Sequence, residues 1–259
     1  MIEFINISLL PVFLLVFVRI LAFFIVIPLF SYRTIPTPFK IGMSFFLTLV
    51  LVMTLPTTTL DFEFSYVLLL LKEIVIGLML GWFSYMVVSA VQIAGGFIDF
   101  QMGFAIANVV DPQTGAQSPI IGQYFYMIAL LFLLSIDGHH LLIDGIYGSF
   151  QMIPIDQMIT FNQESIVMFV IQTFGQMFII AFQIAIPIVG CLFLVDLALG
   201  IIARTVPQMN VFVVGLPLKI FVSFIVLFLF MSLYISLSKK LFQTMFETLH
   251  GLMQLIGGV

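Results

Sequence analysis

The sequence has 259 residues, of which 63% are hydrophobic and 8% are charged, and its formal net charge is −4. Soluble domains contain about 25% charged residues, so this chain has too few polar side chains to coat a water-facing surface, and the same composition excludes intrinsic disorder. The few basic residues are scattered, which excludes a nucleic-acid-binding surface, and the one cysteine, Cys191, excludes a disulfide framework or a thiolate metal cluster. A mean hydropathy of +1.29 indicates a polytopic membrane protein.

Six apolar stretches predict an all-α membrane protein with about six long helices. A bilayer core of about 30 Å requires about 20 apolar residues for each crossing helix. The stretches are 7–30, 39–56, 66–94, 119–136, 166–203 and 211–237. Two of them, 66–94 and 166–203, are longer than one crossing needs, so we expect tilted, kinked or broken helices, with a kink at Pro187. Residues 141–153 are too short and too rich in glycine to assign.

Charged residues in the loops predict the orientation of these spans. The 31–40 and 204–219 loops contain basic residues and no acids, whereas acidic residues dominate the 57–65 loop and the 137–165 region. Because basic loops tend to stay in the cytoplasm, six crossings would place the two basic loops inside and both termini outside. Lys239 and Lys240, at the end of the last stretch, contradict this orientation.

Charge also occurs inside the apolar stretches, at Arg19, at Lys72 with Glu73, and at Asp196. An ionisable group at bilayer depth is costly, so each position is a hypothesis for a functional site. The alternative for each is a structural ion pair or a place nearer the membrane surface. The sequence leaves both interpretations open.

The segment 94–119 is unlike both a membrane span and a soluble loop, because it mixes glycines, bulky apolar residues and polar residues. Its first half contains Gly95, Gly96, Phe97, Phe100, Gln101, Met102, Gly103 and Phe104, and a turn signal follows with Asp111, Pro112, Gly115 and Gln117. Irregular backbone at membrane depth is tolerated only where it is buried in protein or lines a cavity. We therefore expect a re-entrant or pore-lining loop, with a tight surface loop between two spans as the alternative.

Two other segments are candidate sites. Residues 238–259 predict an amphipathic helix that lies on a membrane surface or packs against a partner. The run Asp137, Gly138, His139, His140 predicts a turn with a pair of interfacial histidines rather than a metal site, because adjacent histidines point in different directions. No nucleophile–base arrangement and no nucleotide-binding fingerprint stands out in the sequence, so we expect neither catalysis nor a cofactor.

Several short motifs follow one another in a fixed order between residues 11 and 237. They are Pro28-Leu29-Phe30 with Arg33, Ile35-Pro36, Lys40-Ile41-Gly42, Ala94-Gly95-Gly96, Gln101-Met102-Gly103-Phe104, Asp111-Pro112, Gly115, Gln117, Pro119, Gly138-His139-His140-Leu141, Ser149-Phe150, Pro154, Asp196-Leu197-Ala198-Leu199-Gly200, Arg204, Pro207-Gln208-Met209-Asn210-Val211-Phe212, Gly215, Pro217 and Lys219. Each motif alone is weak, but in this order they make the chain resemble the FliR family of flagellar export-gate proteins, which is shared with type III secretion systems.

This resemblance implies a fold in three parts. A FliP-like helical part at 1–165 would contain a plug loop at about 95–119, a FliQ-like helical hairpin would follow at 166–237, and an amphipathic helix would end the chain at 238–259. The resemblance also implies a single copy of this chain in a helical, pore-forming assembly with FliP and FliQ, completed by FlhB and FlhA. The assembly would lie in the bacterial inner membrane at the flagellar basal body, and unfolded flagellar subunits would pass through its pore.

The resemblance further implies two sets of site residues. The residues named above in the 95–119 segment would form part of the pore plug. The loop that contacts cytoplasmic partners, FlhB among them, would contain Arg204, Pro207, Gln208, Asn210, Phe212, Pro217 and Lys219. Apolar residues such as Phe97 and Phe104 would exclude water from the closed pore, and glycines such as Gly103 would give the backbone freedom to move. The expected mechanism is a plug that the substrate displaces without chemical catalysis.

A small-molecule or ion transporter is the main alternative. Arg19 and Asp196 would then form a coupling site. Transporters often contain inverted repeats with broken helices in matching positions, and this sequence has no convincing repeat of that kind. An intramembrane enzyme and a scaffold without a conduit are further alternatives.

Overall fold

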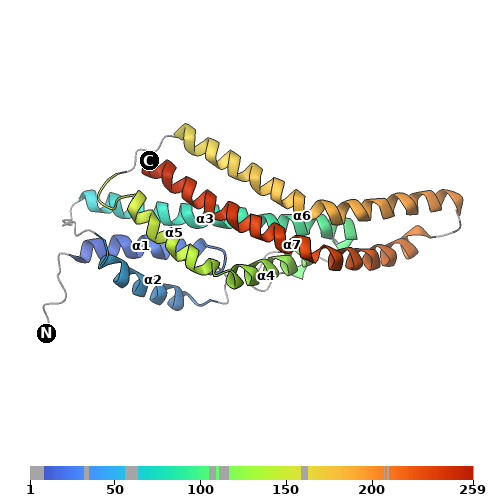
Figure 1. The fold of residues 1–259 in the computed structure, drawn as a ribbon, viewed down its shortest axis with the longest axis horizontal. Coiled ribbons are helices and arrows are strands. Elements are labelled where there is room, and N and C mark those ends of the chain that lie inside the picture. Colours follow the sequence, from blue (N-terminus) through green and yellow to red (C-terminus); the bar gives the residue numbers. More distant parts are fainter. Residues whose placement is uncertain are drawn as a thin grey trace. The chain divides into compact units, whose positions relative to one another are not determined.

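The computed structural model describes residues 9–31, 35–55, 64–104, 109–110, 117–158, 163–206, 208 and 210–258. Most of these residues lie in the helices of Figure 1, which are α1 (Leu10–Val26), α2 (Thr37–Val52), α3 (Phe64–Met102), α4 (Ile120–Ser135), α5 (Gly138–Met152), α6 (Gln163–Thr205) and α7 (Val211–Gly257). Two short strands, β1 (Val109–Val110) and β2 (Gln117–Ser118), pair antiparallel with Val109 opposite Ser118. The predicted all-α class is confirmed.

Helix α3 continues through part of the segment for which we expected irregular backbone. Residues 94–102 are helical and the irregular chain begins only at Gly103, so the prediction of a loop from residue 95 is wrong. Gly95 and Gly96 each weaken a helix by about 1 kcal/mol relative to alanine. Packing offsets this cost, because a side chain at Gly95 would collide with the backbone of Gly122 in α4. Gly103 then ends the helix with a φ of +88°, a left-handed conformation that favours glycine.

Two further helices differ from the prediction. α5 forms in a stretch that the sequence left unassigned, because Leu142, Ile146 and Phe150 lie on one buried face of it. α7 is one continuous helix, so the prediction of a separate C-terminal helix is wrong. Apolar residues of its last part, such as Met245 and Leu252, are buried. This face of α7 therefore packs against protein.

Three helices are long and apolar enough to cross a membrane, over Ser65–Met102, Glu164–Thr205 and Val213–Gly257. A fourth span results if α4 and α5, which are interrupted at Ile136 and Asp137, act as one broken span. α1 and α2 are apolar but have only 17 and 16 residues, about 26 and 24 Å of helix at 1.5 Å per residue. For the described part of the chain, the prediction of six crossings is too high. The orientation of the loops stays a prediction.

The chain divides into two compact units, each built from segments that are far apart in the sequence. The first unit consists of Met1–Val87, Asp137–Thr173 and Thr244–Val259, and the second consists of Val88–Ile136 and Phe174–Gln243. The division into FliP-like and FliQ-like parts rests on the resemblance described above and stays a prediction.

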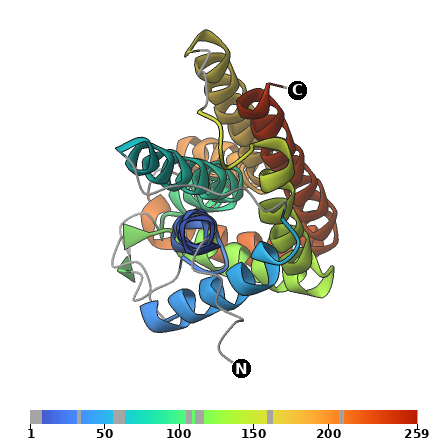
Figure 2. The ribbon, with the colours of Figure 1, turned by 90° about the vertical axis from the view of Figure 1, so that its left-hand side faces the viewer.

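In the first unit, α1 packs against both α2 and α3. Figures 1 and 2 show α1 and α2 side by side. Gly77 and Gly81 of α3 face α1: a side chain at Gly77 would collide with the backbone of Arg19. A side chain at Gly81 would come within 2.9 Å of the Cβ atom of Val26. Small residues at this spacing allow two apolar helices to approach closely.

In the second unit, aromatic contacts join α3 to α6 and α4 to α7. Phe97 of α3 lies against Phe182 of α6, with ring centroids 5.3 Å apart. Tyr234 of α7 stacks on Phe125 of α4 at 4.3 Å, and its hydroxyl donates a hydrogen bond of 2.6 Å to the Phe125 carbonyl oxygen. The one polar atom of this buried aromatic pair is therefore satisfied.

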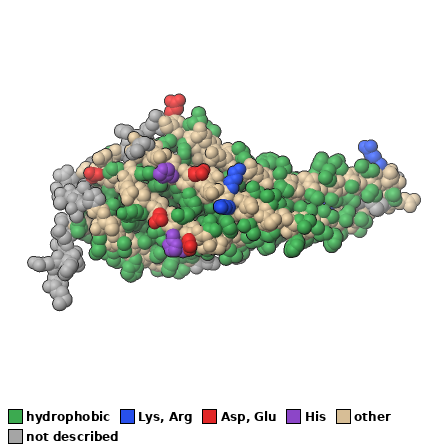
Figure 3. All heavy atoms as spheres, viewed as in Figure 1, with side chains coloured by type: hydrophobic (Ala, Val, Ile, Leu, Met, Phe, Trp, Pro, Cys, Tyr) green, Lys and Arg blue, Asp and Glu red, His purple; other side chains and the backbone are tan. Residues whose placement is uncertain are grey.

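Much of the surface is apolar. Figure 3 shows hydrophobic side chains over most of the face in view, with few charged side chains among them. Only 33% and 22% of the most apolar windows of α6 and α7 are buried, against 61% in α3. Exposed apolar surface of this extent requires lipid or another protein to cover it.

Candidate functional site

The predicted plug residues that the structure describes lie at the end of α3 and directly after it. Phe97 packs against Phe182, as described above, and Met102 is fully buried. Phe100 is 75% exposed, and Phe104 lines an apolar cavity of about 410 Å³ between α4 and α7. Met102 is therefore a buried anchor, whereas the Phe97 and Phe100 rings are both exposed, at 37% and 75%.

The second half of the predicted plug is described only in part. Asp111, Pro112 and Gly115 lie outside the described residues, and for Gln117 the structure describes the backbone alone, in β2. The role of these residues stays a prediction.

Asp99 holds the end of α3 against the start of α4. It is 3% exposed, and its Oδ1 atom accepts a hydrogen bond of 3.2 Å from the backbone N–H of Ile121. The N-cap residue of α4 is Pro119, whose side chain makes no capping hydrogen bond, so Asp99 supplies from α3 the acceptor that a helix N-terminus needs. The sequence alone did not predict this role for Asp99. The one indication in the sequence was a single acid in an apolar segment, upstream of a helix whose N-cap residue is proline.

The Asp196 carboxylate contacts two residues, Lys219 and Gln101, and these three residues have three different predicted roles. Lys219 Nζ lies 2.7 Å from Asp196 Oδ1, and Gln101 Nε2 donates a hydrogen bond of 2.7 Å to Asp196 Oδ2. We call these three residues the Asp196 junction. It joins the end of α3 to α6 and to the first turns of α7, so a predicted plug residue, a predicted intramembrane charge and a predicted loop residue meet at one point.

The Asp196 junction is not sealed from its surroundings. The side chains of Asp196 and Lys219 are 38% and 19% exposed. An ion pair at this exposure is weaker than a buried one, because solvent screens it.

The other predicted residues of the α6–α7 connection lie on the surface. Arg204 stands in the last turn of α6, where a positive charge complements the negative end of the helix dipole. The exposed residues are Arg204, Gln208, Asn210 and Pro217. Pro207 lies outside the described residues, and only the backbone of Phe212 is described. Their predicted contact with a partner stays a prediction.

Arg19 of α1 lies in a fully buried ion pair. Its Nε atom donates to Glu73 Oε2 of α3, and both side chains are 0% exposed. The remaining guanidinium donors reach the backbone oxygens of Ser149 at 3.0 Å and Ile153 at 3.1 Å. The Phe150 ring lies 4.2 Å from the Arg19 Cζ atom. The guanidinium nitrogens therefore have hydrogen-bond partners and the Phe150 ring lies next to them. This favours the interpretation of Arg19 as part of a structural ion pair.

Lys72 is the second cation of this cluster. It lies 2.8 Å from Glu73 Oε1 and donates to three backbone oxygens, of Pro154 at 2.8 Å, and of Ile155 and Gln157 at 3.0 Å each. Together with Arg19, it satisfies carbonyl groups at and beyond the C-terminus of α5, which a helix end leaves unpaired. The sequence could not indicate this role, because α5 was not assigned.

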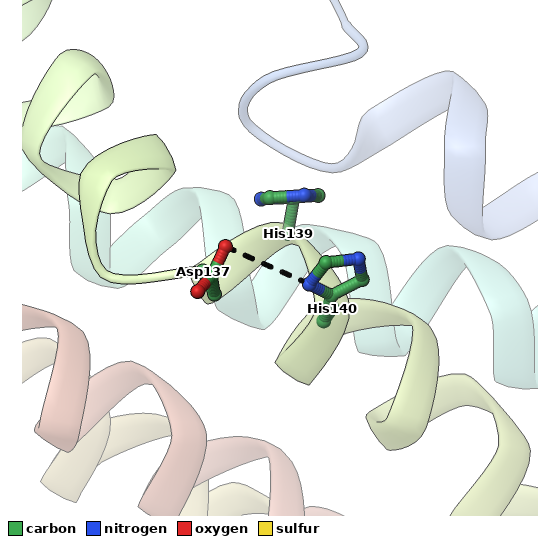
Figure 4. Close-up of side chains that lie close together, drawn as sticks. All are labelled: Asp137, His139 and His140. Carbon is green, nitrogen blue, oxygen red and sulfur yellow. Dashed lines mark ion pairs between the residues drawn. The ribbon is translucent and has the colours of Figure 1, made fainter.

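Asp137, His139 and His140 gather at the start of α5 (Figure 4). Their ligand atoms lie within 4.8 Å of one another. The Asp137 carboxylate faces the His140 ring, with Oδ1 3.8 Å from Nδ1, and the His139 and His140 ring centroids lie 4.1 Å apart at 37°. Asp137 makes the predicted turn with a φ of 56°, but the expectation that the adjacent histidines point in different directions is wrong.

Comparison with known proteins identifies the family. Residues 10–245 match the family described as bacterial export proteins, family 1. The flagellar biosynthetic protein FliR of Bacillus subtilis (strain 168) is 60% identical over 223 residues, which cover 85% of this chain and 86% of that protein. The proteins of the same name from Pectobacterium carotovorum subsp. carotovorum and Escherichia coli (strain K12) are 34% and 31% identical, over 82% and 79% of this chain and 80% and 78% of their own length.

These matches confirm the resemblance that the ordered motifs indicated. They extend over both compact units and over every helix of the described chain. This chain therefore belongs to the bacterial export proteins, family 1, as a relative of the flagellar biosynthetic protein FliR.

Proposed function

We propose that this chain is a core subunit of the flagellar protein export gate and forms part of the pore through which unfolded flagellar subunits are secreted. The observation that carries the proposal is the 60% identity with a flagellar biosynthetic protein over 85% of the chain. The family is described as one of export proteins, and the apolar helices suit a membrane-embedded component of that apparatus. The bacterial inner membrane, at the flagellar basal body, is the proposed location.

The proposed partners are FliP and FliQ, which would surround a single copy of this chain, with FlhB and FlhA as further components. Support comes from the exposed apolar side chains of α6 and α7, such as Leu194 of α6 at 64% and Leu229 of α7 at 71%. In the assembly, neighbouring helices would cover these side chains. The basic α6–α7 connection, with Arg204 exposed at the end of α6, would remain free for a cytoplasmic partner.

The plug would be the end of α3 and the chain that follows it. Apolar side chains here are suited to closing a pore, because a narrow apolar constriction excludes water and ions. Phe100 is 75% exposed, so its ring is free to project into a conduit. Gly103, at φ +88°, ends the helix, and its backbone freedom would let the chain change direction there when the plug moves.

A transporter coupling site at Arg19 and Asp196 is not favoured. Each of these residues has partners of its own: Arg19 pairs with Glu73, and Asp196 pairs with Lys219. The family is one of bacterial export proteins, and the relatives are named for flagellar biosynthesis rather than for small-molecule transport or catalysis.

Co-purification tests the proposed function. The tagged chain is expressed together with FliP and FliQ, extracted in mild detergent and separated by size. We expect one stable complex that contains all three proteins, and we expect cells without this chain to secrete no flagellar subunits. A chain that elutes alone, from cells whose flagellar secretion does not depend on it, would overturn the proposal.

A further inference from the structure

We infer that the Asp196 junction is a latch that holds the end of α3, residues 97–104, against the α6–α7 hairpin, and that this end is released only when the latch breaks. The inference rests on the proposed gate function and adds the element that controls it. Its residues are Gln101, Asp196 and Lys219, which belong to three different helices.

The bonding pattern makes Asp196 the centre of the latch. Each carboxylate oxygen has its own partner: Lys219 on Oδ1 and Gln101 on Oδ2, both at 2.7 Å. Loss of the Asp196 charge therefore weakens two contacts at once, one across the hairpin and one to α3. Loss of Lys219 weakens only the first directly, but it leaves the carboxylate without its counter-charge.

A second contact lies next to the latch on the same elements. A side chain built at Gly103 would come within 3.0 Å of the Leu216 Cδ1 atom of α7. The backbone that leaves α3 therefore lies directly against the first turns of α7. The polar contact at Gln101 and the apolar contact at Gly103 hold two consecutive points of the α3 end to one hairpin.

The exposure of the junction suits a contact that opens and closes. Asp196 is 38% exposed, so solvent can replace a broken partner without leaving a bare buried charge. The Arg19–Glu73 pair is fully buried. Separating it would leave an unpaired charge in an apolar interior, at a far larger cost in free energy. The buried Arg19–Glu73 pair is therefore suited to a permanent contact, and the Asp196–Lys219 pair to a reversible one.

Ion leak across the membrane tests the latch in cells that assemble the complete gate. The variants are Asp196→Asn and Lys219→Met, with the charge-swapped pair Asp196→Lys, Lys219→Asp as the rescue. Lys240→Met is the matched control, because Lys240 is another lysine of α7 that bonds a neighbouring helix, at Gln183 Oε1 and 3.2 Å. We expect both single variants to leak severalfold more than wild type, the charge swap to restore a closed gate, and Lys240→Met to match wild type. Wild-type leak in both single variants, at wild-type amounts of assembled complex, would overturn the inference.

A chemical cross-link keeps the test decisive if the single variants fail to assemble. Gln101→Cys and Asp196→Cys are introduced together with Cys191→Ser, and a short cleavable bis-thiol reagent joins the two new thiols. We expect export to stop when the link forms and to resume when it is cleaved. Normal export through a completely linked gate would show that α3 and α6 need not separate, and would overturn the inference.

Different results would contradict the proposed function and the latch. If the chain co-purifies with its partners and its removal stops secretion, while the latch variants behave as wild type, only the latch is wrong. If secretion continues without the chain, the proposed function itself is wrong.

Discussion

Glu73 is fully buried between two cations. Its carboxylate faces two buried cations, Arg19 and Lys72, and the remaining donors of those cations bind backbone oxygens between Ser149 and Gln157. A buried charge is tolerated only when it is paired and hydrogen-bonded. The single acid therefore allows both cations to hold the C-terminal end of α5.

We expect Glu73→Gln to destabilise the first unit strongly. The substitution leaves two buried cations without a counter-charge, and breaking a buried pair in this way costs about 3–5 kcal/mol. Thermal unfolding of the purified complex measures the effect, with Glu247→Gln, at an exposed position of α7, as the control. Equal melting temperatures for the two variants would contradict the structural role of Glu73.

Contacts distant in sequence decide where the elements begin and end. The apolar runs 166–203 and 211–237 located α6 and the first part of α7, whereas the continuation of α7 to Gly257 did not follow from hydropathy. The continuation of α3 does not follow from local sequence, because Gly95 and Gly96 disfavour helix, and the compensating contact lies on Gly122, in another helix. The contacts of the Asp196 junction could not be predicted for the same reason. Its three residues were each predicted to be functional, but the contacts between them depend on tertiary packing.

The two neighbouring glycines of α3 should respond in opposite ways to alanine. Gly95→Ala forces α3 away from Gly122, and overpacking of this kind costs about 1–3 kcal/mol. A side chain at Gly96 would make an ordinary contact of 3.5 Å with the Pro119 Cγ atom, so Gly96→Ala should be neutral or should stabilise the helix by up to about 1 kcal/mol. Thermal unfolding of both variants checks the contrast, and equal effects would show that α3 and α4 do not approach as described.

The whole molecule exposes more apolar surface than a soluble monomer tolerates. Composition predicted this property from the shortage of charged residues, and the structure locates it on α6 and α7. The partners that cover this surface could not be derived from hydropathy, because lipid and protein satisfy apolar side chains equally well. Family membership favours protein partners. Among the described residues, three helices, or four with the broken α4–α5 pair, are long and apolar enough to cross a membrane, against six apolar stretches in the sequence.

A charge placed on the exposed apolar face should therefore prevent assembly. We expect Phe221→Glu to remove the chain from the complex with FliP and FliQ and to leave the free chain more sensitive to protease than the assembled one. Gln243→Glu, at an exposed polar position of the same helix, is the control and should assemble normally. Normal assembly of Phe221→Glu, or equal protease resistance of free and assembled chain, would argue against burial of this face.

The claim that this chain closes an export pore is tested most directly by deleting residues 104–112 and measuring the leak of small ions in cells that assemble the gate. We expect a severalfold higher leak, because the apolar barrier at the end of α3 is lost. Wild-type leak together with wild-type secretion would contradict it.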